Sequence, residues 1–362
     1  MATIFDPIKL GDLELSNRII MAPLTRCRAD EGRVPNALMA EYYVQRASAG
    51  LILSEATSVT PMGVGYPDTP GIWSNDQVRG WTNVTKAVHA AGGKIVLQLW
   101  HVGRVSHPSY LNGEAPVAPS AIQPKGHVSL VRPLADYPTP RALETAEIAD
   151  IVDAYRVGAE NAKAAGFDGV EIHGANGYLL DQFLKTGSNH RDDAYGGSIE
   201  NRARLLIEVA RAVVQAVGGG RTGIRLSPVT PANDVLDADP QPLFEYVLRE
   251  LAPLGLAYVH VIEGATGGPR ELADRPFDYA ALKAAYRNAG GQAAWMVNNG
   301  YDKVLAEKAL ADGADLVAFG KPFISNPDLV RRLREDAPLN AWDKNTFYGG
   351  GAKGYIDYPA LA

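Results

Sequence analysis

The segment IADIVDAYRVGAENAKAAGFDGVEIHG, Ile148 to Gly174, contains one complete unit of a helix and a strand, and it decides the fold class. The apolar face of the helix comprises Ile148, Ile151, Val152, Tyr155, Ala159 and Ala162. These residues recur at spacings of three and four, which is typical of an amphipathic helix, and Gly166 supplies a C-terminal stop. Val170 to Ile172, bounded by glycines, then predicts a short buried strand.

The same alternation extends along the chain in both directions. Further helical patterns occupy residues 199–219, 242–255 and 303–313. The candidate strands centre near Ile20, Leu53, Val96, Ile172, Ile224, Val259, Met296 and Ala318. Eight buried strands separated by helices predict a parallel sheet covered by helices, and eight is the number that closes into a (β/α)8 TIM barrel. A doubly wound open sheet is the structural alternative.

Two segments fall outside this alternation. Residues 1–16 show strand-like alternation around Gly11 and Asp12, a hairpin signal, and we expect them to cap the bottom of the barrel. Residues 101–143 contain many prolines and glycines but no periodic pattern. Because they follow the third strand, we expect a long loop that forms a wall or lid over an active site. Residues 1–362 should therefore form a single TIM-barrel domain with these two additions.

Composition argues against several kinds of partner. The formal net charge is −6, and no run of Lys and Arg forms a basic stripe, so nucleic acid is not expected. The N-terminus lacks a signal-peptide pattern, and no apolar run is long enough to cross a bilayer. We expect a cytoplasmic protein without a membrane partner. The single cysteine, Cys27, is consistent with a reducing compartment.

The C-terminal ends of the strands carry the catalytic groups in a TIM barrel. The last two strands end in VNNGY and FGKPF, where glycines, a helix N-terminus and Lys321 predict a site for a phosphate-containing ligand. Ordinary turn glycines are the alternative explanation. Arg225 ends the fifth strand, where an unpaired guanidinium is costly. We expect it to meet an anionic or electron-rich ligand, with a structural salt bridge as the alternative.

Three polar residues follow the fourth strand within six positions: His173, Asn176 and Tyr178. The histidine and the asparagine provide two donors that could hold one carbonyl or nitro oxygen. The phenol stays protonated at neutral pH because its reference pKa is about 10. Together they predict an oxyanion-stabilising pair with a proton donor.

Five motifs, in order along almost the whole chain, resemble the Old Yellow Enzyme family of FMN-dependent ene-reductases. They are PLTR at 23–26, QLWHVGR at 98–104, GVEIHGANGYLLDQFL at 169–184, SNHRDDAYGGSIENRARLL at 188–206 and FGKPFISNPDL at 319–329. The resemblance implies FMN bound at the barrel mouth and NADPH or NADH as a co-substrate, with NADPH the more frequent choice among similar proteins. The implied FMN-binding positions are Pro23, Thr25, Ala56, Gln98, Arg225, Asn299, Gly300, Gly320 and Lys321.

The resemblance also implies roles for individual residues. Thr25 would bond the flavin carbonyl nearest the hydride-carrying nitrogen, and Gln98 and Arg225 would face the pyrimidine edge. His173 and Asn176 would hold the activating group of the substrate, and Tyr178 would supply the proton. The implied walls of the substrate pocket are Tyr66, Trp100 and Tyr348.

The implied activity is reduction of the C=C bond of alkenes that a carbonyl or nitro group activates, by a ping-pong mechanism. Enones, enals, maleimides and nitroalkenes are the expected acceptors, with nitrate esters as a further candidate class. We expect a monomer or a weak homodimer. The alternatives are a metal-dependent TIM-barrel hydrolase and a barrel that only binds a phosphorylated ligand. Against the hydrolase, neither a His-x-His nor a His-Glu-x-x-His spacing occurs, so no metal site is expected.

The chain departs from the family at one position and points to one branch of it. Lys321 stands where arginine is usual, so a phosphate would lose a bidentate partner and keep a single positive charge. Thr25 indicates the branch with threonine near the flavin, and Cys27 is then a buried bystander. GGGAKG at 349–354 fits a dinucleotide fingerprint formally, but no strand precedes it, and we expect a C-terminal loop.

Overall fold

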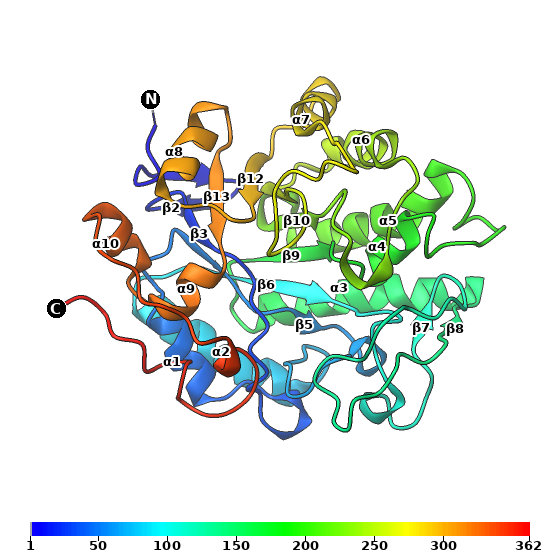
Figure 1. The fold of residues 1–362 in the computed structure, drawn as a ribbon, viewed down its shortest axis with the longest axis horizontal. Helices are drawn as coiled ribbons and strands as arrows, with labels where there is room; N and C mark the ends of the chain where they lie inside the picture. Colours follow the sequence, from blue (N-terminus) through cyan, green and yellow to red (C-terminus); the bar gives the residue numbers. More distant parts are fainter. Residues whose placement is uncertain (1) are drawn as a thin grey trace.

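A closed barrel of eight parallel strands forms the centre of the molecule, as described for residues 2–362 by a computed structural model (Figure 1). Neighbouring strands pair in parallel around the whole circle, and β13 closes onto β3. The barrel strands are β3 (Ile19–Met21), β4 (Leu51–Leu53), β6 (Ile95–Trp100), β9 (Gly169–Gly174), β10 (Thr222–Leu226), β11 (Tyr258–Ile262), β12 (Ala294–Asn298) and β13 (Leu316–Phe319). All eight predicted strands are therefore confirmed, and the TIM barrel is correct rather than the open sheet.

Helices follow the strands and cover the outside of the barrel (Figure 1). Polar side chains begin several of them: Asn36, Ser74 and Ser198 each accept a hydrogen bond from a backbone N–H of the first turn. The helices are α1 (Ala37–Val44), α2 (Asn75–Ala90), α3 (Ile148–Ala164), α4 (Leu179–Leu184), α5 (Ile199–Val217), α6 (Pro240–Leu251), α7 (Tyr279–Asn288), α8 (Lys303–Ala311), α9 (Lys321–Ser325) and α10 (Leu329–Arg334).

An N-terminal hairpin closes the bottom of the barrel. Strands β1 (Ile8–Leu10) and β2 (Leu13–Leu15) pair antiparallel, and Gly11 adopts a φ of 56° in the turn between them. The hairpin leucines pack against residues inside the barrel, including Ile20, Leu51 and Leu316. The predicted hairpin cap is thus present, and the lower barrel interior is apolar.

The interior changes character toward the mouth. Successive residues of a strand face opposite sides, so positions two apart share the interior. On β6, Val96 belongs to the apolar lower cluster, and the next interior positions are Gln98 and Trp100. On β11, Tyr258 in the lower cluster is followed by His260. A polar layer therefore lies above the apolar one, whereas most TIM barrels fill these layers with Val, Ile and Leu.

The long loop after β6 runs over the mouth of the barrel. It holds one short parallel pair, β7 (Val117–Ala118) with β8 (Arg141–Ala142), and β5 (Thr57–Ser58) extends the barrel edge beside β6. Loop residues Val128 and Tyr137 pack in one cluster with Trp100. Residues 349–354 form a loop, as predicted. None of the helices in residues 2–362 has the length and apolar character needed to cross a membrane.

Candidate active site

Neighbouring strands bring polar side chains together at the mouth. His173 on β9 and Arg225 on β10 are register partners, and both are almost fully buried. Arg225 Nη2 donates to Asn298 Oδ1 at 2.7 Å, and Asn298 Nδ2 donates to the carbonyl of Ala318 at 2.7 Å. The second bond fixes the orientation of the Asn298 amide, so its oxygen faces the guanidinium. The sequence left a salt bridge open as the partner of Arg225, and the observed partner is an amide.

Buried polar atoms without partners mark the space above this layer. Among residues 2–362, Trp100 Nε1, His173 Nδ1 and Arg225 Nε are buried and make no hydrogen bond. A buried donor without a partner costs about 1–3 kcal/mol, so these atoms indicate a polar ligand. The pyrimidine edge of FMN offers acceptor oxygens, which fit the unpaired Arg225 Nε. The residues that are present are therefore compatible with a flavin.

Burial keeps the His173 imidazole neutral. It lowers the pKa of this histidine well below its usual range, and the positive charge of Arg225 and the nearby His260 lower it further. A neutral imidazole can donate one hydrogen bond to an oxygen without adding charge to the site. The ring also packs edge-on against Tyr178, with centroids 5.2 Å apart.

Three aromatic side chains form a wall beside His173. The rings of Tyr66 and Trp100 stack at 5.4 Å, and Tyr178 meets Trp100 edge-on at 5.0 Å. The hydroxyl groups of Tyr66 and Tyr178 are hydrogen-bonded at 3.0 Å. Burial raises the pKa of Tyr178 to about 12, so the phenol keeps its proton at neutral pH.

Asn176 lies in a strained turn that three contacts hold in place. Its φ is 59°, in the left-handed region that asparagine tolerates better than most residues. Its backbone N–H donates to Ser227 Oγ at 2.7 Å, and its carbonyl accepts from Asn233 Nδ2 at 2.8 Å. Its side-chain Oδ1 accepts from Thr266 Oγ1 at 2.6 Å. The side-chain amide group is therefore the part of Asn176 that remains to donate to a ligand.

The predicted phosphate end lies after β12 and β13. Gly300 adopts a φ of 67° and faces open space, and Gly320 precedes the first turn of α9, which begins at Lys321. The Lys321 ammonium lies over the Trp342 ring, 5.9 Å from its centroid. Asn299 differs from the other predicted phosphate positions, because its side chain bonds the loop after β11. Its Nδ2 donates to the carbonyls of Glu263 and Ala265. Only the backbone of Asn299 is left for a phosphate.

The exits of β3 and β4 supply three more of the predicted cofactor positions. Pro23 and Thr25 are half-buried there, and Ala56 belongs to the aromatic cluster of Trp100. The backbone N–H of Arg26 donates to the Glu55 carboxylate at 3.2 Å, which ties this turn to the exit of β4. Burial raises the pKa of the Glu55 carboxyl to about 7.

Tyr348 belongs to the C-terminal segment, far along the chain, and lies near enough to Tyr66 and Tyr178 to add to the rise that burial causes in the pKa of both phenols. Two arginines of the β3 exit hold that segment: Arg26 Nε donates to the carbonyl of Phe347 at 2.9 Å, and Arg28 Nη2 donates to that of Thr346 at 3.0 Å. The Tyr348 side chain is 51% exposed. It therefore lies on the rim, whereas Tyr66 and Trp100 form the inner wall.

Sequence reasoning missed several residues of the site. Tyr137 and Asn233 lie in loops without periodic signals, and so does Thr266, so nothing in their neighbourhood distinguished them. Glu171 and His260 did carry a signal, because each is a polar residue inside an otherwise apolar strand. Neither residue was predicted to belong to the site.

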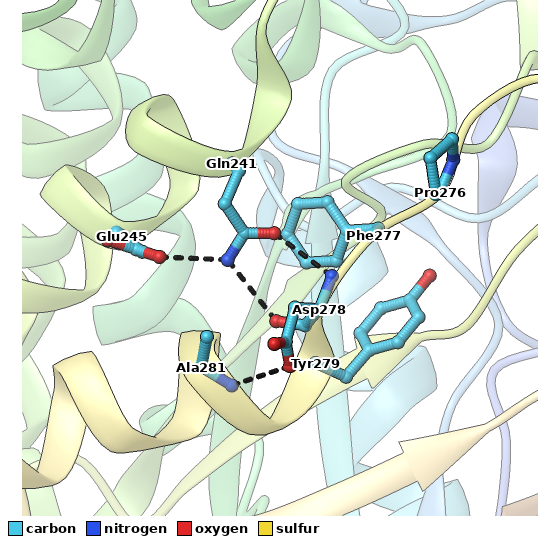
Figure 2. A pocket seen from close by; sticks show the side chains of 7 residues that line it. All are labelled: Gln241, Glu245, Pro276, Phe277, Asp278, Tyr279 and Ala281. Carbon is cyan, nitrogen blue, oxygen red and sulfur yellow. Dashed lines mark hydrogen bonds between the residues drawn. The ribbon is translucent and has the colours of Figure 1, made fainter.

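Two surface hollows lie elsewhere. One, of about 640 Å³, sits between α6 and α7, where Gln241 bonds Glu245 and the backbone of Asp278 (Figure 2). The other, of about 890 Å³, is lined by Trp295, Tyr301 and neighbouring residues. Neither contains a predicted site residue, so the mouth of the barrel remains the candidate site. No group of three or more metal-ligating side chains occurs within residues 2–362.

Comparisons with known proteins agree with this geometry. Residues 3–340 match the model of the NADH:flavin oxidoreductase / NADH oxidase family. Among curated proteins, 12-oxophytodienoate reductase 1 of Oryza sativa subsp. japonica is 45% identical, over 98% of this chain and 92% of that protein. Flavin oxidoreductase hxnT of Emericella nidulans is 44% identical, over 98% of this chain and 97% of that protein.

Solved structures give the same result. The Old Yellow Enzyme homologue from Zymomonas mobilis superposes with a TM-score of 0.95 at 44% identity, over 99% of this chain and all of that one. Morphinone reductase in complex with tetrahydroNAD gives a TM-score of 0.92 at 48% identity, over 100% of this chain and 98% of that one. With a family match over most of its length and relatives this similar, the chain belongs to the Old Yellow Enzyme family and is an NAD(P)H-dependent FMN oxidoreductase.

Proposed function

We propose that this enzyme reduces the C=C bond of alkenes activated by a carbonyl or nitro group. The observation that supports this most directly is one short turn that presents a neutral imidazole, an amide and a protonated phenol beside an incompletely bonded arginine. Two relatives are reductases named for 12-oxophytodienoate and morphinone, both carbonyl compounds. Enones, enals, maleimides and nitroalkenes are the proposed acceptors, followed by nitrate esters.

The cofactor would be held along the whole mouth. FMN, when bound, supplies the chemistry of accepting a hydride from the nicotinamide and delivering it to the alkene. Gln98 and Arg225 are proposed to bind its pyrimidine edge, and Thr25 the carbonyl near the reactive nitrogen, as in the threonine branch. Pro23 and Ala56 would line the ring. Gly300 and Gly320, the backbone of Asn299 and the Lys321 ammonium would hold the phosphate.

The substrate would lie between this site and the aromatic wall. His173 and Asn176 are proposed to donate to the activating oxygen, which stabilises the charge that gathers there during reduction. Tyr178 is proposed to give its proton to the carbon next to the activating group. Tyr66 and Trp100 would form the inner wall and Tyr348 the rim, with residues 101–143 covering the pocket. Because nicotinamide and alkene would use the same space in turn, we propose ping-pong kinetics, with NADPH or NADH as the co-substrate.

Tyr178→Phe tests the proposed mechanism. It removes the proton donor and leaves the ring, so flavin reduction by the nicotinamide should keep nearly its normal rate. Reoxidation by an enone should slow by roughly 10²–10⁴-fold, the range for a lost general acid. A nitroalkene should be affected less, since its reduced product is a stable anion that can take a proton from water. Rapid mixing separates the two half-reactions.

The result that would overturn the assignment is specific. If Tyr178→Phe slows flavin reduction and leaves enone turnover intact, Tyr178 is not the acid. If neither substrate class reoxidises the wild-type enzyme after it has been reduced by NADPH or NADH, the proposed substrates are wrong.

A further inference from the structure

A carboxylate lies inside the barrel where a TIM barrel ordinarily places an aliphatic side chain. Glu171 occupies the middle of β9 and is fully buried. An isolated buried carboxylate is costly, so its partners indicate why it is there.

The adjacent strand β6 and the strand β11, one beyond β10, provide those partners. Gln98 Nε2 donates to Glu171 Oε1 at 2.7 Å from β6, where the two residues are register partners. On the other side, His260 Nδ1 lies 2.8 Å from Glu171 Oε2. All three side chains are almost fully buried. The carboxylate thus links three strands just below the mouth.

The chemistry of this contact determines the orientation of Gln98. An ionised carboxylate can only accept hydrogen bonds, so Gln98 must turn its NH₂ group toward Glu171. Its Oε1 is then the atom left for a ligand above. A flavin pyrimidine edge presents one N–H donor between two carbonyl oxygens, and Gln98 Oε1 matches the donor while Arg225 matches an oxygen.

Glu171 also acts on Arg225 through charge. Arg225 lies on β10 two positions beyond the register partner of Glu171, so it is the next interior residue toward the mouth. Burial lowers the pKa of Arg225, and the negative charge of Glu171 is the strongest effect that opposes this. The carboxylate therefore offsets part of the positive charge that Arg225 offers to a ligand.

We propose that Glu171 is the positioning residue for the pyrimidine end of FMN: it orients the Gln98 amide, offsets the Arg225 charge, and so lowers the flavin midpoint potential. This inference rests on the proposed placement of FMN at Gln98 and Arg225. It assigns a function to a residue that need not touch the cofactor.

Glu171→Gln tests the proposal in the FMN-loaded enzyme. The substituted amide can present either its oxygen or its NH₂ to Gln98, so the orientation of Gln98 is no longer fixed. Oxidised FMN should bind roughly tenfold more weakly, the scale of one well-placed hydrogen bond. Reduced, anionic FMN should bind nearly as before, because the variant no longer carries the Glu171 charge that offsets the positive charge of Arg225. The ratio of the Kd for oxidised FMN to the Kd for reduced FMN then rises tenfold. For a two-electron couple, this corresponds to a midpoint potential about 30 mV more positive.

A control removes an equivalent charge elsewhere. Glu208 on α5 accepts a hydrogen bond from Tyr195 at 3.0 Å in the outer layer. Glu208→Gln should leave both the Kd for FMN and the midpoint potential unchanged. A further readout uses 3-methyl-FMN, which lacks the pyrimidine N–H. The wild type should discriminate against it more strongly than Glu171→Gln does.

The outcomes separate this inference from the proposed function. A wild-type protein that takes up no FMN overturns both. A wild type that binds FMN beside a folded Glu171→Gln variant with unchanged Kd and midpoint overturns the role of Glu171 alone. If circular dichroism shows that Glu171→Gln does not fold, Glu171→Asp replaces it, since it keeps the charge but cannot reach both partners. Weaker binding of oxidised FMN by Glu171→Asp supports the inference, and an unchanged Kd overturns it.

Discussion

The hydroxyl groups of Tyr66 and Tyr178 are hydrogen-bonded at 3.0 Å, so the proposed proton donation by Tyr178 would involve two residues rather than one. Burial raises the pKa of both phenols, which makes the phenolate left behind by a donated proton costly. A hydrogen bond from Tyr66 to the Tyr178 oxygen would reduce that cost. Tyr66, proposed as a wall of the pocket, would then also assist the acid.

Tyr66→Phe should therefore slow enone reduction by about 2–10-fold, the worth of one neutral hydrogen bond, and leave nitroalkene reduction nearly unchanged. Rapid mixing of the reduced enzyme with each acceptor measures both effects. Tyr195→Phe, which removes a hydroxyl from the outer layer, serves as the control. Equal slowing of both acceptors would indicate that Tyr66 only shapes the pocket.

The sequence predicted the residues at strand ends better than those in loops. Gln98, His173 and Arg225 follow from strand periodicity and from the rule that barrel sites lie at the carboxyl ends of strands. Thr266, which bonds the Asn176 side chain from 90 residues away, follows from no local pattern. Asn299 shows a third case: its position was predicted, but its side chain supports a loop, which only the fold reveals.

At the scale of elements, the turn before α4 depends on the first residues of that helix. Asp181 Oδ2 accepts from the Gly177 N–H at 2.8 Å and from Lys185 Nζ at 2.9 Å. Gln182 Nε2 donates to the carbonyl of Gly177 at 2.8 Å and to that of Val102 at 3.0 Å. The motif LLDQFL thus builds the support for Asn176 and Tyr178. The apolar residues of this motif predicted that the helix is buried. The hydrogen-bond partners of Asp181 and Gln182 could be identified only from the folded structure.

Asp181→Asn should destabilise the protein by about 3–5 kcal/mol, because it leaves the Lys185 ammonium buried without a counter-charge. Both side chains are almost fully buried, so solvent screening is small. Urea unfolding measures the change. Asp181→Asn combined with Lys185→Met should recover most of the lost free energy of unfolding. Neither charge of the Asp181–Lys185 pair then remains, and the asparagine can still accept a hydrogen bond from the Gly177 N–H. A single variant as stable as the wild type would contradict the ion-pair account.

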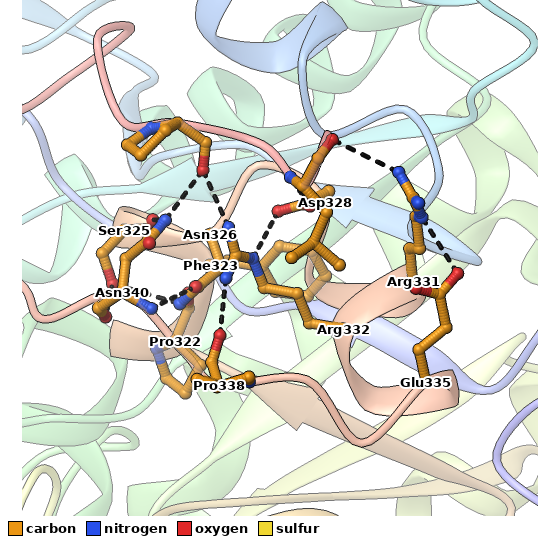
Figure 3. Close-up of polar contacts among 12 residues, drawn as sticks. Pro322, Phe323, Ser325, Asn326, Asp328, Arg331, Arg332, Glu335, Pro338 and Asn340 are labelled. Carbon is orange, nitrogen blue, oxygen red and sulfur yellow. Dashed lines mark hydrogen bonds and ion pairs between the residues drawn. The ribbon is translucent and has the colours of Figure 1, made fainter.

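At the scale of the whole molecule, the C-terminal segment carries Tyr348, a proposed rim residue of the site, while forming almost no regular structure. Arg332 of α10 fastens it: Nη1 donates to the carbonyl of Pro338 at 2.5 Å and Nη2 to that of Pro359 at 2.9 Å (Figure 3). Asn340 adds a bond from Nδ2 to the carbonyl of Ser325 at 2.8 Å. Such contacts join side chains to distant backbone carbonyls, which explains why periodicity predicted the barrel but not the path of this segment.

Arg332→Ala and its neighbour Arg331→Ala should consequently differ in their effects. Arg332 is buried, so its loss leaves the carbonyl of Pro338 without a donor, at about 1–3 kcal/mol, and leaves Asn340 Nδ2 as the remaining donor to the carbonyl of Pro359. Arg331 is exposed. It pairs with Glu335, an interaction that contributes little, and it donates to the carbonyls of Leu361 and Ala362, which lie outside residues 339–358. Hydrogen exchange across residues 339–358 should accelerate in Arg332→Ala and stay near the wild-type rate in Arg331→Ala. Because Tyr348 lies in this segment, the KM for the alkene should rise in Arg332→Ala while flavin reduction keeps its rate. Unchanged exchange in Arg332→Ala would mean that Arg26 and Arg28 are sufficient to hold the segment, and the rim would then depend on β3 alone.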